Sequence, residues 1–151
     1  MTHSRRLHVA IVDPRYVPLI LSGAKTIECR LTRSRVPPFE CAEPGERIYF
    51  KARSGAFRCA AVIRKAEFIA LAGPESVIAL RTEHDHAVRG DEDYWRSKAD
   101  ARFASLIHLR DPEPIECGPD LASLVRPGDR RAWHVFPAEV GPRPSPGLFD
   151  R

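Results

Sequence analysis

The sequence lacks long hydrophobic segments. No run within its 151 residues approaches the ~18 consecutive apolar residues of a membrane-spanning helix. The basic N-terminus, residues 1–6, leads into a strand-like pattern without the apolar region of a secretory signal. A Gly-x-Ser-x-Gly motif, a phosphate-binding loop and a dinucleotide fingerprint are also missing, and nothing points to a cofactor. We therefore expect a soluble, cytoplasmic protein that makes no membrane contact.

The cysteines show no metal-binding spacing. The four cysteines, at positions 29, 41, 59 and 117, include no Cys-x-x-Cys pair. Cys29 and Cys59 fall in apolar strand patterns, where a reduced thiol acts as a small buried hydrophobe, and the other two fall in loop-like segments. His84-Asp85-His86 has metal-ligand residue types, but helical residues at i and i+2 point to roughly opposite sides. The sequence therefore predicts no metal site.

Hydrophobic periodicity predicts strands and short helices separated by proline and glycine. We predict strands at residues 7–12, 25–32, 47–52, 58–69, 103–110 and 131–136, helices at residues 16–22, 74–88 and 91–101, and mostly loop at residues 112–129. The length suits one domain, and no internal repeat is visible. We assign residues 1–136 to a single domain and residues 137–151, which contain four prolines, to a C-terminal tail.

The most informative stretch is residues 22–30, where a helix gives way to a strand. Gly23 suits the left-handed position that closes a helix. The alternation that follows places Glu28 and Arg30 side by side on the polar face of the strand. Lys25 falls at the mouth of this strand, where its side chain can reach into a cleft. Exposed charge pairs are common, so periodicity alone is more typical of a solvated face.

Positive charge is concentrated in the half of the chain that contains this stretch. Residues 1–65 hold 13 Lys and Arg against 5 Asp and Glu, a net charge of +8, whereas residues 66–151 hold 11 against 15, a net charge of −4. A basic surface attracts phosphate groups. A general bias of the genome toward arginine would produce the same composition, so both interpretations remain open.

The pattern Gly23-x-Lys25-x-x-Glu28-x-Arg30 resembles the signature of the ASCH domain, a branch of the PUA-like superfamily of small β-barrels. The resemblance runs from about residue 7 to residue 136. Residues 45–50 resemble the family's Gly-Asp-x-Ile strand, residues 51–55 its Lys-x-x-Ser-Gly turn, and residues 132–136 its closing strand. The resemblance implies an α+β fold, in which a small mixed β-barrel is flanked by short helices.

The resemblance also implies a cleft that binds single-stranded RNA or a modified nucleoside or nucleotide. Lys25 and the arginines would bind phosphate, Glu28 would accept a hydrogen bond from a base or ribose, and an aromatic ring would stack on a base. The predicted binding residues are Lys25, Thr26, Glu28, Arg30, Lys51, Arg53, Ser54, Tyr94 and Trp95. Packing in the core is the alternative role of the two aromatic residues.

Hydrolysis is the alternative activity, because some ASCH-domain proteins are ribonucleases or amidohydrolases that remove acetyl from N4-acetylcytidine. Lys25 and Glu28 would then be the catalytic residues. In those amidohydrolases the third residue after the motif lysine is a threonine proposed as the nucleophile, and this chain has Glu28 there. That difference weakens the acetyl-removing assignment and leaves water activation or phosphodiester cleavage open. A small-molecule or protein adaptor is a third interpretation, and the sequence gives no oligomeric state.

Overall fold

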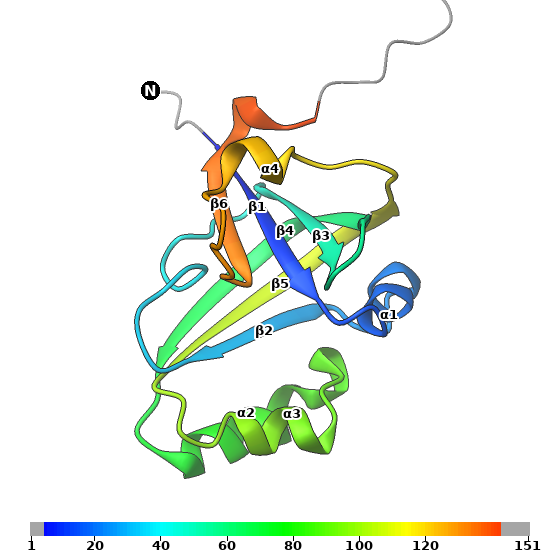
Figure 1. Ribbon diagram of the computed structural model, residues 1–151. Helices are drawn as coiled ribbons and strands as arrows, with labels where there is room; N and C mark the ends of the chain where they lie inside the picture. Colours follow the sequence, from blue (N-terminus) through cyan, green and yellow to red (C-terminus); the bar gives the residue numbers. More distant parts are fainter. Residues whose placement is uncertain (1–4, 143–151) are drawn as a thin grey trace, which may run out of the picture.

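The computed structural model describes residues 5–142 and shows a curled sheet with short helices around it (Figure 1). Six strands are ordered β2-β5-β4-β3-β1-β6. Their bounds are β1 (Arg6–Val12), β2 (Ile27–Thr32), β3 (Arg47–Ala52), β4 (Phe57–Ala70), β5 (Phe103–Pro114) and β6 (Trp133–Pro137). β1 and β3 run parallel, whereas the other neighbouring pairs are antiparallel. The mixed sheet curls into a half-barrel, which confirms the predicted α+β class.

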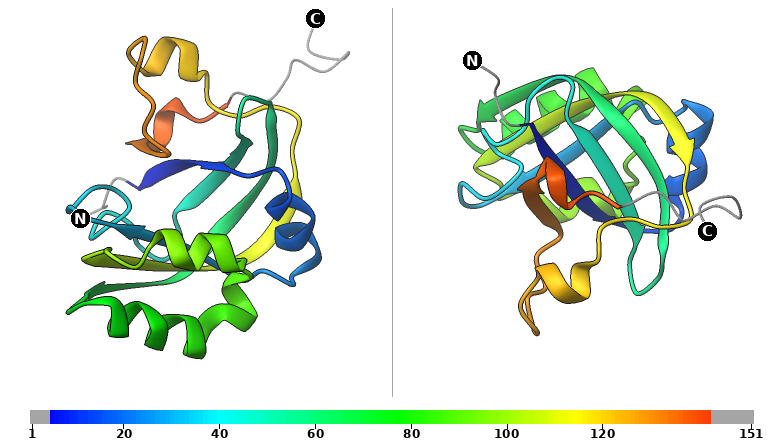
Figure 2. Two further views of the ribbon diagram at one scale, coloured as in Figure 1. Left: turned by 60° about the horizontal axis from the view of Figure 1, so that its bottom comes forward. Right: turned by 90° about the horizontal axis from the view of Figure 1, so that it is seen from above.

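The helices of residues 5–142 are short. They are α1 (Tyr16–Ser22), α2 (Pro74–Val88), α3 (Glu92–Ser97), α4 (Leu121–Leu124) and a 3₁₀ turn, η1 (Ala138–Val140). Figures 1 and 2 show α2 and α3 side by side below β2, and α4 at the opposite end of the molecule near β6. None of the helices in this range is long and apolar enough to cross a membrane.

Three hydrophobic clusters hold the described residues together, and two of them position the site. The interior of the half-barrel is filled by fully buried side chains such as Ile48, Phe50 and Ile63. A second cluster lies between β2, β5 and the helices, where Cys29 of β2 packs with residues such as Leu80 of α2. Each fully buried aliphatic or aromatic side chain contributes about 1.5–3 kcal/mol. Because β2 has buried residues on both of its faces, its polar side chains lie against protein instead of bulk water.

Most predicted elements are confirmed, and the differences lie at their ends. β2 begins at Ile27, two residues later than predicted, because the N–H groups of Lys25 and Thr26 donate to carbonyls of Leu19 and Ala87. β5 continues to Pro114 because its far end pairs with the beginning of β4. The segment predicted as loop contains the single-turn helix α4.

The predicted tail begins inside ordered structure. Pro137 is the last residue of β6, and the N–H of Ala138 donates to the carbonyl of Arg5 at 3.0 Å. Val140 packs against the cluster formed by β1, β3 and β4. The rest of the predicted tail, residues 143–151, lies outside the described residues.

A buried polar chain connects β1, β6 and the segment before β3. Trp133 Nε1 donates to His8 Nδ1 at 3.0 Å, and His8 Nε2 lies 2.8 Å from Glu46 Oε1. Since an indole nitrogen only donates, His8 Nδ1 is unprotonated and Nε2 donates to Glu46. Glu46 also accepts from Arg6 and from the backbone N–H of Glu43. Burial lowers the pKa of His8, in agreement with a neutral ring.

Candidate functional site

A cleft of about 570 Å³ opens beside the polar face of β2. We call it the β2 cleft. Glu28 and Arg30 come from β2, Tyr16 from α1, Tyr94 from α3, and Arg53 from the turn after β3. Glu28 and Arg30 of the predicted motif therefore line a concave surface, and residues of α1 and α3 form the rest of its walls.

Gly23 sets the direction in which the chain enters this site. Its φ of 82° is in the left-handed region, and its N–H donates to the carbonyl of Ile20 at 3.2 Å. A residue with a Cβ is strained in that conformation, whereas glycine is not. The helix therefore ends at Ser22, and the chain turns toward the start of β2, as the sequence predicted.

Lys25 lies just before β2, at the mouth of the strand as predicted, but its side chain is buried and does not line the β2 cleft. Its side chain is only 3% exposed, and Nζ donates to the carbonyls of Ile27 at 2.8 Å and Val88 at 2.6 Å. Val88 is the last residue of α2, so the ammonium caps the carbonyl end of that helix. Burial lowers the pKa of Lys25, and the negative charge of Glu28 opposes this shift.

Four acidic residues line the cleft, namely Asp13, Glu28, Asp91 and Asp93, and Glu28 alone among them is buried. Its Oε1 accepts from Arg30 Nε at 3.0 Å. Its Oε2 is buried, lies 3.8 Å from Lys25 Nζ, and has no hydrogen-bond donor among residues 5–142. A buried acceptor without a donor is costly, so such atoms in folded proteins call for a partner. A donor group of a ligand would reach this oxygen only after a shift of the Glu28 side chain, because Oε2 itself is buried.

Arg30 joins the free edge of β2 to the opposite side of the half-barrel. Its guanidinium donates to the carbonyl of Ile11 at 3.0 Å and to that of Ala132 at 3.4 Å. It also lies over the ring of Trp133, 5.2 Å from the centroid. Together with the hydrogen bond to Glu28, these contacts fix the Arg30 guanidinium. It therefore positions the Glu28 carboxylate and is not free to move toward a ligand.

Two basic side chains on the cleft wall are available for an anion. Arg53 and Lys98 have no carboxylate within 4 Å among residues 5–142, whereas Arg15 Nη1 lies 2.5 Å from Asp91 Oδ2. Lys98 Nζ lies 5.8 Å from the ring centroid of Tyr94. The unpaired cations thus lie on the same cleft as the buried carboxylate.

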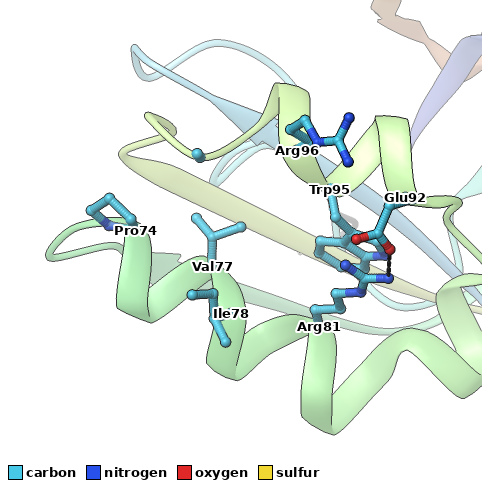
Figure 3. A pocket seen from close by; sticks show the side chains of 8 residues that line it. Pro74, Val77, Ile78, Arg81, Glu92, Trp95 and Arg96 are labelled. Carbon is cyan, nitrogen blue, oxygen red and sulfur yellow. Dashed lines mark hydrogen bonds and ion pairs between the residues drawn. The ribbon is translucent and has the colours of Figure 1, made fainter.

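The two adjacent aromatic residues of α3 point to different places. Tyr94 lines the β2 cleft, and its hydroxyl donates to the carbonyl of Cys29 at 2.8 Å. Trp95 lines a separate groove between α2 and α3, close to Val77 and Arg81 (Figure 3). Its indole Nε1 donates to Asp85 Oδ1 at 2.9 Å. Trp95 is therefore a packing residue of the helix layer, which was the alternative interpretation of this ring.

The remaining predicted residues lie away from the cleft. Thr26 is exposed just before β2, and Ser54 is exposed in the turn after β3, with a φ of 56°. Lys51 lines another hollow, beside α4. The structure thus gathers Glu28, Arg30, Arg53 and Tyr94 on one cleft, while the buried Lys25 lies 3.8 Å from Glu28 and does not line it.

Sequence reasoning missed Arg15, Tyr16 and Lys98 on the cleft wall. The N-terminal turn of α1 was predicted correctly, but no local pattern shows that this turn faces β2. The only signal in the sequence was the carboxylate of Glu28, and its position does not show which residues form the opposite wall of the β2 cleft. No group of His, Cys, Asp or Glu residues within 5–142 is arranged to hold a metal ion.

Comparison with solved structures identifies the fold. A scan of family models and a search of curated proteins found no match. The crystal structure of ASCH from Zymomonas mobilis superposes with a TM-score of 0.60 at 20% identity, over 88% of this chain and 89% of that one. A serine-to-alanine variant of ZmASCH gives 0.65 at 22% identity, over 92% and 94%. A tyrosine-to-phenylalanine variant gives 0.64 at 21%, over 90% and 94%. The chain therefore has the fold of the ASCH structures.

Proposed function

We propose that the β2 cleft binds the base of a nucleoside or of single-stranded RNA, with Glu28 as its hydrogen-bond acceptor. The observation that carries this proposal is the buried Oε2 of Glu28, which has no donor among residues 5–142. Amino and imino groups on base edges are donors of the required kind, and an unstacked base exposes them. A base inserted edge-first would satisfy this oxygen.

The rest of the cleft suits the other parts of a nucleotide. Arg53 and Lys98 supply unpaired positive charge for a phosphate. The ring of Tyr94, fixed by its bond to Cys29, supplies an apolar wall against which a base can pack. The cleft volume of about 570 Å³ is in the range of small-ligand sites.

Substitution of Glu28 tests the proposal. We expect wild-type protein to bind cytidine monophosphate and short RNA in low salt, measured by calorimetry and fluorescence anisotropy. A hydrogen bond to a charged group contributes about 1.5–3 kcal/mol, so Glu28→Gln should weaken binding about 10- to 150-fold. Glu83→Gln, which removes an exposed carboxylate of α2, is the matched control and should bind as wild type does. Equal affinity of the two variants would refute the role of Glu28.

Hydrolysis is a second candidate function, favoured by the buried pair of Lys25 and Glu28 at 3.8 Å. Glu28 would remove a proton from water, whose oxygen attacks the acyl carbon. As the carbon–nitrogen bond breaks, the same proton would pass to the departing amine. Lys25 does not line the cleft, so it would act only by stabilising the charge on Glu28.

Incubation with N4-acetylcytidine and with labelled RNA tests this second function. Turnover by wild-type protein that is abolished in Glu28→Ala and retained in Glu83→Gln would support it. Turnover that persists undiminished in Glu28→Ala would identify a contaminating enzyme.

A further inference from the structure

A second hollow, of about 500 Å³, adjoins the β2 cleft. We call it the α4 hollow. It is lined by Lys51 of β3, by residues of α4, and by the loop that carries Arg126 and Arg130. Ile11 at the end of β1 lines both the cleft and the hollow, and Ala132, a cleft residue, follows Arg131 of the hollow. The two depressions therefore form neighbouring parts of one surface.

The α4 hollow carries positive charge that the protein does not neutralise. Lys51, Arg126 and Arg130 have no carboxylate within 4 Å among the residues that the structure describes, although Asp129 also lines the hollow. Asp129 is bound instead by Arg131, whose Nη2 lies 2.7 Å from Oδ2. Both Arg126 and Arg130 are exposed, so their side chains can adjust to an anion.

We infer that the α4 hollow binds backbone phosphates of nucleotides that flank the one in the β2 cleft. This rests on the proposed function of the cleft and specifies its ligand as single-stranded RNA of several nucleotides, not a free nucleoside. Single-strand binding sites combine a basic groove along the backbone with a place for an unstacked base. Here the unpaired cations form that groove, and the cleft receives the base.

The depth of Glu28 is the reason why the ligand is single-stranded. Glu28 is 6% exposed and its Oε2 is buried, so a donor reaches this oxygen only from a base that has left its stack, and only with a shift of the carboxylate. In a duplex the pairing edges are already bonded, and the cost of unpairing opposes insertion. Binding of the flanking phosphates offsets the cost of ordering the strand.

The test compares ligands of increasing length with paired variants. Arg126→Ala/Arg130→Ala removes two exposed, unpaired charges from the hollow. Arg58→Ala/Arg102→Ala removes two exposed charges that line neither depression and have no ion pair among the described residues, so it is the matched control. The probes are cytidine monophosphate and labelled RNA of two, four and eight nucleotides, titrated from about 50 to 200 mM salt, where phosphate contacts have their largest effect.

For wild-type protein we expect the eight-nucleotide RNA to bind at least tenfold more tightly than the mononucleotide. Arg126→Ala/Arg130→Ala should bind the eight-nucleotide RNA no more tightly than the mononucleotide. The slope of log affinity against log salt concentration should be smaller by about 1.4 in this variant, since each phosphate contact to a single strand contributes about 0.7. Its affinity for the mononucleotide should equal that of wild type. The control variant should retain both the gain and the slope.

The outcomes separate the two proposals. If wild-type protein binds the mononucleotide and the octanucleotide equally, or if the hollow and control variants behave alike, the inference about the hollow is wrong while the cleft function stands. If no probe binds wild-type protein, or if RNA binding is unchanged by Glu28→Gln, the proposed function itself fails, and the inference fails with it. Equal preference for a duplex of the same length would overturn the assignment to single strands.

Discussion

Replacing Lys25 with methionine is expected to destabilise the fold strongly, because the buried ammonium serves three groups. Nζ donates to the carbonyls of Ile27 and Val88 and lies 3.8 Å from Glu28 Oε2. Methionine keeps most of the aliphatic stem but removes every donor. The variant therefore leaves the carbonyls of Ile27 and Val88 without this hydrogen-bond donor, and the buried carboxylate of Glu28 without this positive charge.

The magnitude follows from the environment of the pair. Removing one partner of a buried ion pair costs about 3–5 kcal/mol, because the other charge stays buried. Burial lowers the pKa of Lys25, because desolvation penalises the charged ammonium. We therefore expect the loss in free energy of unfolding to lie near the lower limit of this range. For a protein of this size, a loss of 3–5 kcal/mol corresponds to a decrease in Tm of about 6–20 °C.

Urea and thermal unfolding at neutral pH measure this change. The control is Lys65→Met, in which a side chain that is 55% exposed loses an ion pair with Glu67, and it should cost less than about 1 kcal/mol. The double variant Lys25→Met/Glu28→Gln should cost less than the sum of the single changes, by about 0.5–3 kcal/mol. A loss in Lys25→Met no larger than in Lys65→Met would refute a structural role of this ammonium.

Two further predictions concern buried titratable groups of β1, β2, β4 and the segment before β3. Burial lowers the pKa of His8 below its ordinary 6.5, so below that pH the unfolded chain binds more protons and the free energy of unfolding should fall. Burial would raise the pKa of Glu46, but hydrogen bonds from His8, the Glu43 amide and Arg6 outweigh it and lower the pKa below 4.5, so stability should fall again in stronger acid. Urea unfolding across this range checks both, and a flat profile would contradict them. Burial raises the pKa of Cys29 and of Cys59 to about 11, so both thiols should react with a disulfide reagent far more slowly than exposed Cys117. Reaction of Cys29 or Cys59 as fast as that of Cys117 would contradict this.

The sequence predicted the elements of this fold well because their signals are local. The glycine that ends α1, the alternation in β2 and the proline at the start of α2 act within a few residues of their own positions. Errors occurred where a partner far along the chain decides the outcome. The extension of β5 to Pro114 depends on pairing with Cys59, and no pattern within β5 contains that information.

The candidate site was predicted in part. Periodicity correctly placed Glu28 and Arg30 together, since their ion pair lies within one strand. It could not show that Lys25 turns toward the end of α2, because the carbonyl that it caps is 63 residues away along the chain. It also could not separate Tyr94 from Trp95, whose different directions are fixed by bonds to Cys29 and Asp85.

The sequence by itself determined the motif, the alternation that gives β2 one polar face, and the excess of positive charge in the N-terminal half, because these follow from residue type and spacing. Only the tertiary structure decided that the polar face is buried in a cleft, that one oxygen of Glu28 has no donor among the described residues, and that unpaired cations continue from the cleft to the α4 hollow. The physical reason is that burial and charge pairing depend on which distant segments meet. Curling of the sheet, and not local spacing, brings β1, β2 and β6 together around Arg30.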